Sequence, residues 1–397
     1  MELSRKLKSI QPSATLTINA KAAELRAQGV DVISFAVGEP DFDTPAHIRQ
    51  AAKEAMDKGF TRYTPNDGIP ELKKAVVEKF KKDNGLSYAP DQVIVNVGGK
   101  HSGYLVMQAL LNPGDEVIVP APYWVSYHPM VVLAGGTPVV VPTRQEDEFK
   151  LTVDQLKKAL TPKTKAVIIN SPSNPTGSVY GAQELRPLAE ACAAADLLMM
   201  SDEMYESIIF DGLKFVSTAG LGDDIFNKTV TLNGVSKAYA MTGWRIGYMA
   251  GPLELIKACS KIQSHSTSNA CSIAQKAAVA ALTGPQDEVR AMAAEFEKRR
   301  DYIVKRLGEI KGAVCPPPRG AFYVFPNFLA YYGKSANGKA IQGSKDMSAY
   351  LLEAAHVATV PGVEFGEDSC IRISYATSQK LIASGMDRIQ EALAKLT

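Results

Sequence analysis

Seven short apolar runs, separated by segments with helical patterning, constrain the fold of this 397-residue chain most strongly. Each run is apolar at consecutive positions, which is typical of strands that are buried on both faces of a sheet. The segments between the runs supply the crossovers that parallel strands need. We predict a doubly wound α/β fold whose mostly parallel sheet is built from residues 91–99, 115–120, 137–142, 164–172, 197–203, 229–234 and 245–251.

The pattern changes near residue 286. A long amphipathic stretch (289–310) leads past three prolines to two strand-like runs (321–326 and 370–376) around a helical segment (344–356). We therefore predict a large domain at 46–285 and a smaller C-terminal α+β domain at 286–397. The segment 1–45 contains the turn-rich "GEPDFDTP", and we predict that it is an N-terminal arm or loop that also contributes to the small domain.

The chain carries 44 basic and 42 acidic residues without a basic cluster, which argues against nucleic acid or an anionic membrane as a partner. Its five cysteines are widely spaced and include no C-x-x-C pair, so neither a disulfide framework nor a metal site is expected. No run reaches the ~18 apolar residues that span a bilayer, and no signal peptide is evident. We expect a cytoplasmic protein that acts on small molecules.

Ligands of open α/β sheets bind at the carboxyl ends of strands, and several polar residues follow the predicted strands. Asp202 comes after "LLMM", where a buried carboxylate needs a cation or several donors, although a helix N-cap or an ion pair would also explain it. Tyr205 is close enough to reach the same ligand. The prolines of "NSPSNPTG" fix the orientation of Asn174, and Trp124 in "APYWVSY" offers an indole that could cover an aromatic ligand or simply pack.

Four cations occupy positions that call for anions. Lys100 opens a predicted helix after Gly98 and Gly99, whose amides favour a phosphate or carboxylate, although "VGGKHSG" matches no nucleotide-binding motif. Lys237 and Arg245 lie among small and apolar neighbours in "LNGVSKAYAMTGWRIGYMAG". Arg372 alternates with isoleucines in "CIRIS", which suits either bidentate capture of a carboxylate or an inter-domain salt bridge.

Together these residues match the requirements of one cofactor. Pyridoxal 5'-phosphate needs an acid at its ring nitrogen, a hydroxyl and an amide at its ring oxygen, a planar group over its ring, amides and an arginine at its phosphate, and a nucleophilic lysine. Desolvation and a neighbouring cation such as Arg245 would lower the pKa of Lys237, as a Schiff-base lysine requires.

The motifs also carry a family resemblance. "NGVSKAYAMTGWRIG" closely resembles the cofactor attachment site of class I/II pyridoxal-phosphate-dependent aminotransferases, and "GEPDFDTP", "RYTPNDGIPELK", "NSPSNPTG", "SDEMYE", "RGAFYVFP" and "RISYATS" match further blocks of that family in order. The chain looks most similar to bacterial aspartate aminotransferases of subgroup Iβ, some of which also transaminate prephenate. The resemblance implies fold type I of these transferases, with a seven-stranded sheet, and a homodimer with shared active sites.

The resemblance also implies residue roles. Lys237 would hold the cofactor as a Schiff base and move the α-proton, Asp202 would pair with the ring nitrogen, and Asn174 and Tyr205 would bind the ring oxygen under Trp124. The phosphate would be bound by Gly99, Lys100, Ser236, Arg245 and the partner's Tyr63. The substrate α-carboxylate would meet Arg372 and the backbone of Gly38, beside Trp124 and Asn174, and the distal carboxylate would meet Thr15 and Lys100. These roles imply transfer of the amino group of L-aspartate to 2-oxoglutarate, with prephenate as a further acceptor.

Three positions depart from the family pattern, namely His101, Ala270 and Met204, and the first two leave the substrate range open. An aminotransferase for alanine or aromatic amino acids would keep the same machinery. A carbon–sulfur β-lyase or a cyclopropane-forming synthase would share the cofactor, although Thr15 and Lys100 favour acidic substrates. A ligand-sensing domain of a DNA-binding regulator would need an added helix-turn-helix region, for which we expect no room before "GEPDF".

Overall fold

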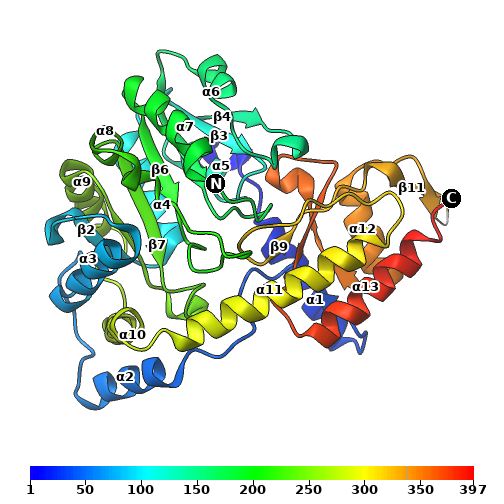
Figure 1. Cartoon of the computed structure of the whole chain (residues 1–397), viewed down its shortest axis with the longest axis horizontal. Helices are drawn as coiled ribbons and strands as arrows, with labels where there is room; N and C mark the ends of the chain where they lie inside the picture. Colours follow the sequence, from blue (N-terminus) through cyan, green and yellow to red (C-terminus); the bar gives the residue numbers. More distant parts are fainter. Residues whose placement is uncertain (337) are drawn as a thin grey trace.

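A seven-stranded sheet forms the larger part of the computed structural model, which describes residues 1–336 and 338–397 (Figure 1). Its strands are β2 (Val93–Asn96), β3 (Glu116–Ala121), β4 (Thr137–Pro142), β5 (Thr164–Asn170), β6 (Leu198–Asp202), β7 (Thr229–Gly234) and β8 (Gly247–Ala250), in the order β2-β8-β7-β6-β5-β3-β4. β8 runs antiparallel to both of its neighbours, β2 and β7, and the remaining neighbouring pairs are parallel. The predicted strands and the mostly parallel sheet are confirmed.

The strands are apolar at consecutive positions because helices cover both faces of the sheet. One face packs on α4 (Gly99–Leu110), α5 (Tyr127–Leu133) and α9 (Leu253–Ser264). The opposite face packs on α6 (Val153–Ala159), α7 (Ala182–Ala194) and α8 (Asp223–Phe226), and near β2 and β8 on α2 (Ala46–Asp57), α3 (Pro70–Asn84) and α10 (Ser272–Thr283). In β2, for example, Ile94 faces α4 while Val93 and Val95 face α3.

Local sequence signals place the helix ends. Helix α3 begins at Pro70, whose ring presets the helical φ and whose missing N–H is not needed there, and it ends before Gly85 at φ 70°. Helix α6 begins with a capping box in which Thr152 accepts from the Gln155 amide while the Gln155 side chain accepts from Thr152.

A second core lies beyond the long helix α11 (Asp287–Gly308), which runs from the sheet region toward the C-terminal helices (Figure 1). A three-stranded antiparallel sheet, β13 (Val360–Pro361), β14 (Ile371–Ser374) and β9 (Tyr323–Val324), packs there with α12 (Ser344–Ala355) and α13 (Gln379–Leu393). Strand β10 (Ser335–Ala336) pairs antiparallel with β11 (Lys339–Ala340). The domain boundaries at residues 45 and 285 stay a prediction.

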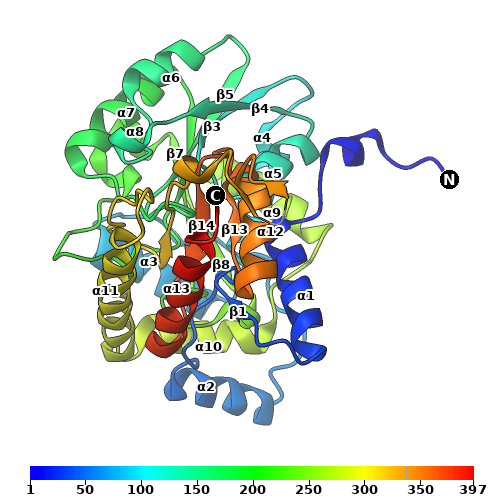
Figure 2. The same ribbon diagram turned by 90° about the vertical axis from the view of Figure 1, so that its right-hand side faces the viewer.

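The N-terminal segment contains more structure than the sequence indicated. Helix α1 (Ala14–Ala27) packs beside α12, and β1 (Ile33–Ser34) pairs in parallel with β12 (Val357–Ala358) (Figure 2). The prediction of an arm or loop for residues 1–45 did not include this helix or this strand. Ala22 is the only fully buried residue of α1, so the helix lacks the apolar stripe that would reveal it in the sequence.

The turn between β2 and α4 fits closely onto β8. A Cβ atom at Gly247 of β8 would lie 2.5 Å from the backbone carbon of Gly98 and 2.5 Å from the amide nitrogen of Gly99. The missing side chain at Gly247 thus lets the amino end of α4 approach the end of the sheet.

We expect Gly247→Ala to lower the free energy of unfolding by about 1–3 kcal/mol, because the added methyl meets backbone atoms that have no free space to move into. Urea unfolding followed by circular dichroism measures the change. The matched control is Gly308→Ala in α11, where an added Cβ meets no atom outside the helix and where alanine stabilises helices by about 0.5–1 kcal/mol. Equal stability of the two variants would contradict the close packing.

Candidate active site

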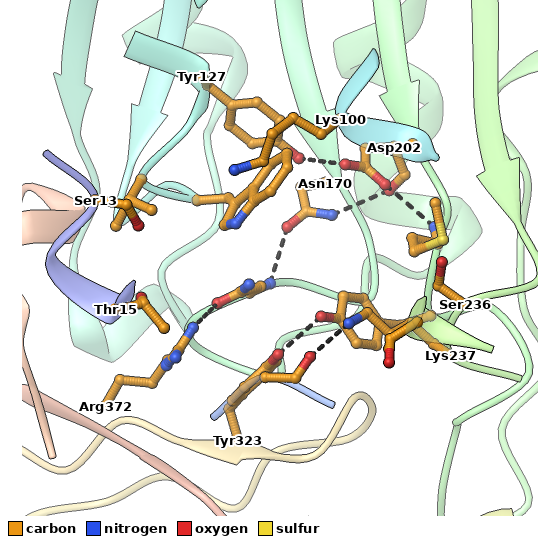
Figure 3. A pocket seen from close by; sticks show the side chains of 18 of the residues that line it. Ser13, Thr15, Lys100, Tyr127, Asn170, Asp202, Ser236, Lys237, Tyr323 and Arg372 are labelled. Carbon is orange, nitrogen blue, oxygen red and sulfur yellow. Dashed lines mark hydrogen bonds between the residues drawn. The ribbon is translucent and has the colours of Figure 1, made fainter. Parts of the chain in front are cut away.

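A cavity of about 260 Å³ lies where the carboxyl ends of β5, β6 and β7 face β14 of the second core (Figure 3). The structure brings to this cavity every predicted site residue except Tyr63: Thr15, Gly38, Gly99, Lys100, Trp124, Asn174, Asp202, Tyr205, Ser236, Lys237, Arg245 and Arg372. Tyr63 is 92% exposed and lies outside the cavity of its own chain.

Lys237 lies in the irregular segment after β7, and its ammonium donates a hydrogen bond to the carbonyl oxygen of Gly38 (Figure 3). The pKa of Lys237 is lowered to about 8, mainly by burial. The charges of Glu39 and Asp202 oppose this lowering, and those of Arg372 and Arg245 add to it. No carboxylate of the described residues forms an ion pair with this amine. Lys237 is therefore a lysine prepared to lose its proton near neutral pH.

Asp202 ends β6, and both of its carboxylate oxygens are fixed. The Tyr127 hydroxyl donates to Oδ2 over 2.6 Å, and the Met204 amide donates to Oδ1 over 3.2 Å. Burial raises the pKa of Asp202, whereas the bond from Tyr127, the Met204 amide and the charge of Lys237 lower it. The site thus holds an oriented acidic group that suits a cationic or protonated nitrogen.

Arg372 is the most confined charge of the cavity. It is 2% exposed on β14, and its guanidinium donates to Asn174 Oδ1 over 3.0 Å and to the carbonyl oxygen of Ala36 over 2.8 Å. Its buried Nε has no partner, and no carboxylate among the described residues lies within ion-pair distance. The inter-domain salt bridge that the sequence left open is not formed, so the buried charge is available for an external anion.

The amino end of α4 forms a cradle for a second anion. In the described part of the chain, the amides of Gly99 and Lys100 donate to no acceptor, and the hydroxyl of Ser236 makes no hydrogen bond. The Arg245 guanidinium packs against Gly98, where an added Cβ would lie 2.4 Å from its Nη2. Free amides at a helix amino end, a hydroxyl and a guanidinium are typical of phosphate sites.

Lys100 and Trp124 form a third side of the cavity. The Lys100 ammonium lies 5.1 Å from the centroid of the Trp124 ring. Burial lowers the pKa of Lys100, and the charge of Arg245 adds to this effect. Thr15, at the start of α1, faces the same space (Figure 3). This side can therefore bind a further carboxylate.

Residues of the cavity that the sequence did not indicate include Tyr127, Asn170 and Tyr323. Tyr127 donates its hydroxyl hydrogen to Asp202. Asn170 donates to the carbonyl oxygen of Asp202 over 3.1 Å and accepts from the Asn174 amide over 2.8 Å, and the hydroxyls of Tyr205 and Tyr323 lie 2.9 Å apart. Asn170 is the polar residue that ends an apolar run, which is a usable signal, whereas nothing in the sequence brings Tyr323 to Tyr205.

Comparisons with known proteins identify the family of the chain. The family model for aminotransferase class I and II matches residues 30–389. The chain is similar to the aspartate/prephenate aminotransferase of Cereibacter sphaeroides (52% identity, covering 100% of this chain and 99% of the relative) and to the aspartate aminotransferase of Geobacillus stearothermophilus (50% identity, covering 98% of each). The crystal structure of the aspartate aminotransferase from Rhizobium meliloti matches with a TM-score of 0.97 at 47% identity, covering 100% of both chains.

The lowered pKa predicts the reactivity of Lys237 in the cofactor-free protein. Only the neutral amine is nucleophilic, so the rate of acetylation at Lys237 should rise with pH and level off above about pH 8. Competitive labelling with mass spectrometry of the Lys237 peptide measures this profile, and Lys237→Ala identifies the peptide signal. A rate that continues to rise tenfold per pH unit toward the ordinary lysine value of 10.5 would contradict the prediction.

Proposed function

This chain belongs to the aminotransferase class I and II family, and we propose that it is an aspartate aminotransferase that transfers the amino group of L-aspartate to 2-oxoglutarate in a ping-pong reaction. The family resemblance and the fold that it implied are confirmed. The observation that carries the proposal is that one cavity contains an amine with a pKa of about 8, Lys237, and a buried guanidinium without an acidic partner, Arg372.

Class I and II aminotransferases depend on pyridoxal 5'-phosphate, and the residues of this cavity fit it. The unpaired amides of Gly99 and Lys100, with Ser236 and Arg245, match its phosphate. The oriented carboxylate of Asp202 matches its ring nitrogen, and Lys237 would hold its aldehyde carbon. Asn174 and Tyr205 would bind its ring oxygen while Trp124 covers its ring.

When bound, the cofactor supplies a carbon that forms a Schiff base with amines and a ring that withdraws electrons from the substrate α-carbon. Asp202 would maintain positive charge at the ring nitrogen, which would strengthen this withdrawal. Lys237 would take the proton from the substrate α-carbon and deliver it to the carbon that was the cofactor's aldehyde carbon, which its lowered pKa allows at neutral pH. One residue would then serve both ends of the proton shift.

The positions of the cations support a substrate with two carboxylates. Arg372 and the Gly38 backbone would hold the α-carboxylate, and the unpaired Nε of Arg372 is one donor that this carboxylate would satisfy. Thr15 and Lys100, on another side of the same cavity, would hold the distal carboxylate. We propose prephenate as a second acceptor because the relative from Cereibacter sphaeroides is named for both aspartate and prephenate.

We also propose a homodimer with shared sites. Tyr63 carries a large phenol that is 92% exposed in the single chain, and the phosphate cradle includes the exposed Arg245. A second copy would bring the partner's Tyr63 to this cradle.

Among the described residues no helix has the length and apolarity to cross a membrane. We propose that the enzyme acts in the cytoplasm.

The function is tested by single half-reactions. Aspartate or glutamate added to the cofactor-loaded protein should cause the visible absorption band of the bound cofactor to disappear. Alanine and tyrosine should do so at least tenfold more slowly, because they provide no carboxylate for Lys100. Lys237→Ala should show no catalytic turnover. Preferential conversion by alanine or tyrosine would contradict the substrate assignment, and release of ammonia and pyruvate from cysteine without an oxo acid would indicate the lyase.

Mixed dimers test the shared site. Co-expressed Tyr63→Ala and Lys237→Ala chains, carrying different tags, should form dimers in which one site combines an intact Lys237 with the partner's intact Tyr63. We expect this site to bind the cofactor with wild-type affinity and to restore about half of the wild-type activity. Cofactor affinity is measured by spectroscopic titration of the purified mixed dimer. Affinity no better than that of the Tyr63→Ala homodimer would contradict a role for Tyr63 across the interface.

A further inference from the structure

Tyr127 is a buried tyrosine whose hydroxyl ends at the acid of the candidate active site. It is the first residue of α5, is 2% exposed, and lines the cavity (Figure 3). Its hydroxyl donates to Asp202 Oδ2 over 2.6 Å and makes no other hydrogen bond among the described residues. The Tyr127 amide donates to the carbonyl oxygen of Trp124 over 3.0 Å, which holds the backbone, and burial of the ring confines the hydroxyl.

In the hydrogen bond between Tyr127 and Asp202, the phenol is the donor and keeps its proton. Burial raises the pKa of the Tyr127 phenol well above 10, and the negative charge of Asp202 raises it further, so the phenol does not ionise near neutral pH. The bond therefore stabilises the charged form of Asp202. Without it, Asp202 would keep only the longer bond from the Met204 amide, 3.2 Å, against the burial that favours its neutral form.

The same side chain also supports the indole of the site. The rings of Trp124 and Tyr127 meet edge to face, with centroids 5.3 Å apart and an interplanar angle of 85°. Removing the hydroxyl alone leaves this ring contact in place. A Tyr127→Phe variant therefore separates the effect on Asp202 from the effect on Trp124.

We propose that Tyr127 is a positioning residue that keeps the Asp202 carboxylate ionised and directed at a protonated aromatic nitrogen bound in the cavity. This inference rests on the proposed function, in which that nitrogen is the ring nitrogen of pyridoxal 5'-phosphate. In this role Tyr127 does not touch the reacting atoms, and its hydroxyl acts through Asp202.

The test compares Tyr127→Phe with Tyr331→Phe. The control removes a buried tyrosine hydroxyl that donates over 2.7 Å to the carbonyl oxygen of Lys311, away from the cavity. Both proteins are loaded with pyridoxal 5'-phosphate labelled with nitrogen-15 in the ring, and the nitrogen chemical shift is recorded at pH 7 without amino acid. We expect the shift in Tyr127→Phe to move from the protonated toward the unprotonated value, and the affinity for the cofactor to fall about tenfold. Tyr331→Phe should match the wild type in both measurements.

Turnover gives a second readout. With aspartate, kcat of Tyr127→Phe should fall about ten- to hundredfold, as is typical for loss of a hydrogen bond to a charged group, while KM stays within about twofold. Nitrogen shift and kcat equal to those of Tyr331→Phe would overturn the proposal, as would a fall in kcat with an unchanged nitrogen shift. Failure of the proposed function would look different, because the wild-type protein itself would not react with aspartate.

Discussion

The buried guanidinium of Arg372 is the constraint on which the site depends. A charge that is 2% exposed and bonded only to the neutral oxygens of Asn174 and Ala36 is costly in the free protein. The cost falls when a carboxylate arrives, and the unpaired Nε offers that carboxylate an additional donor. Burial on β14 also restricts the side chain to one position. The burial of Arg372 thus contributes both to the affinity for one carboxylate and to the orientation of that carboxylate.

Arg372 does not act alone, because a series of hydrogen bonds connects it to the end of the large sheet. Arg372 bonds to Asn174, the Asn174 amide bonds to Asn170, and Asn170 bonds to the carbonyl oxygen of Asp202. Tyr127 completes the series at the Asp202 carboxylate. The group that would hold the substrate and the group that would hold the cofactor ring are therefore positioned by one network that joins the two cores of the molecule.

The charges of the site also explain the reactivity of Lys237. Burial accounts for most of the lowering of its pKa to about 8, and Arg372 and Arg245 contribute because they lie near the amine without forming bonds to it. A bound phosphate or carboxylate would offset part of these two contributions. The nucleophile is thus most easily deprotonated before the anions are bound, when it has to react with the incoming cofactor.

Much of this arrangement could be predicted from the sequence, because continuous apolar runs identify strands buried on both faces and because polar residues at their carboxyl ends share one edge. Asp202 and Lys237 could be predicted in this way. Helix α1 was not, since it buries only Ala22. The antiparallel direction of β8 could not be predicted, because the direction of a strand leaves no pattern in its own residues. The contact between Tyr205 and Tyr323 could not be predicted either, because the two residues are 118 positions apart in the sequence.

Binding of a non-reactive dicarboxylate tests the role of Arg372 most directly. Isothermal titration of the cofactor-loaded protein with succinate should give an affinity at least about 30-fold weaker in Arg372→Gln than in the wild type, which corresponds to about 2 kcal/mol or more for a buried charge pair that loses one partner. The circular dichroism spectrum of the variant establishes that it is folded. Equal affinity in the two proteins would show that the buried guanidinium is not the carboxylate receptor.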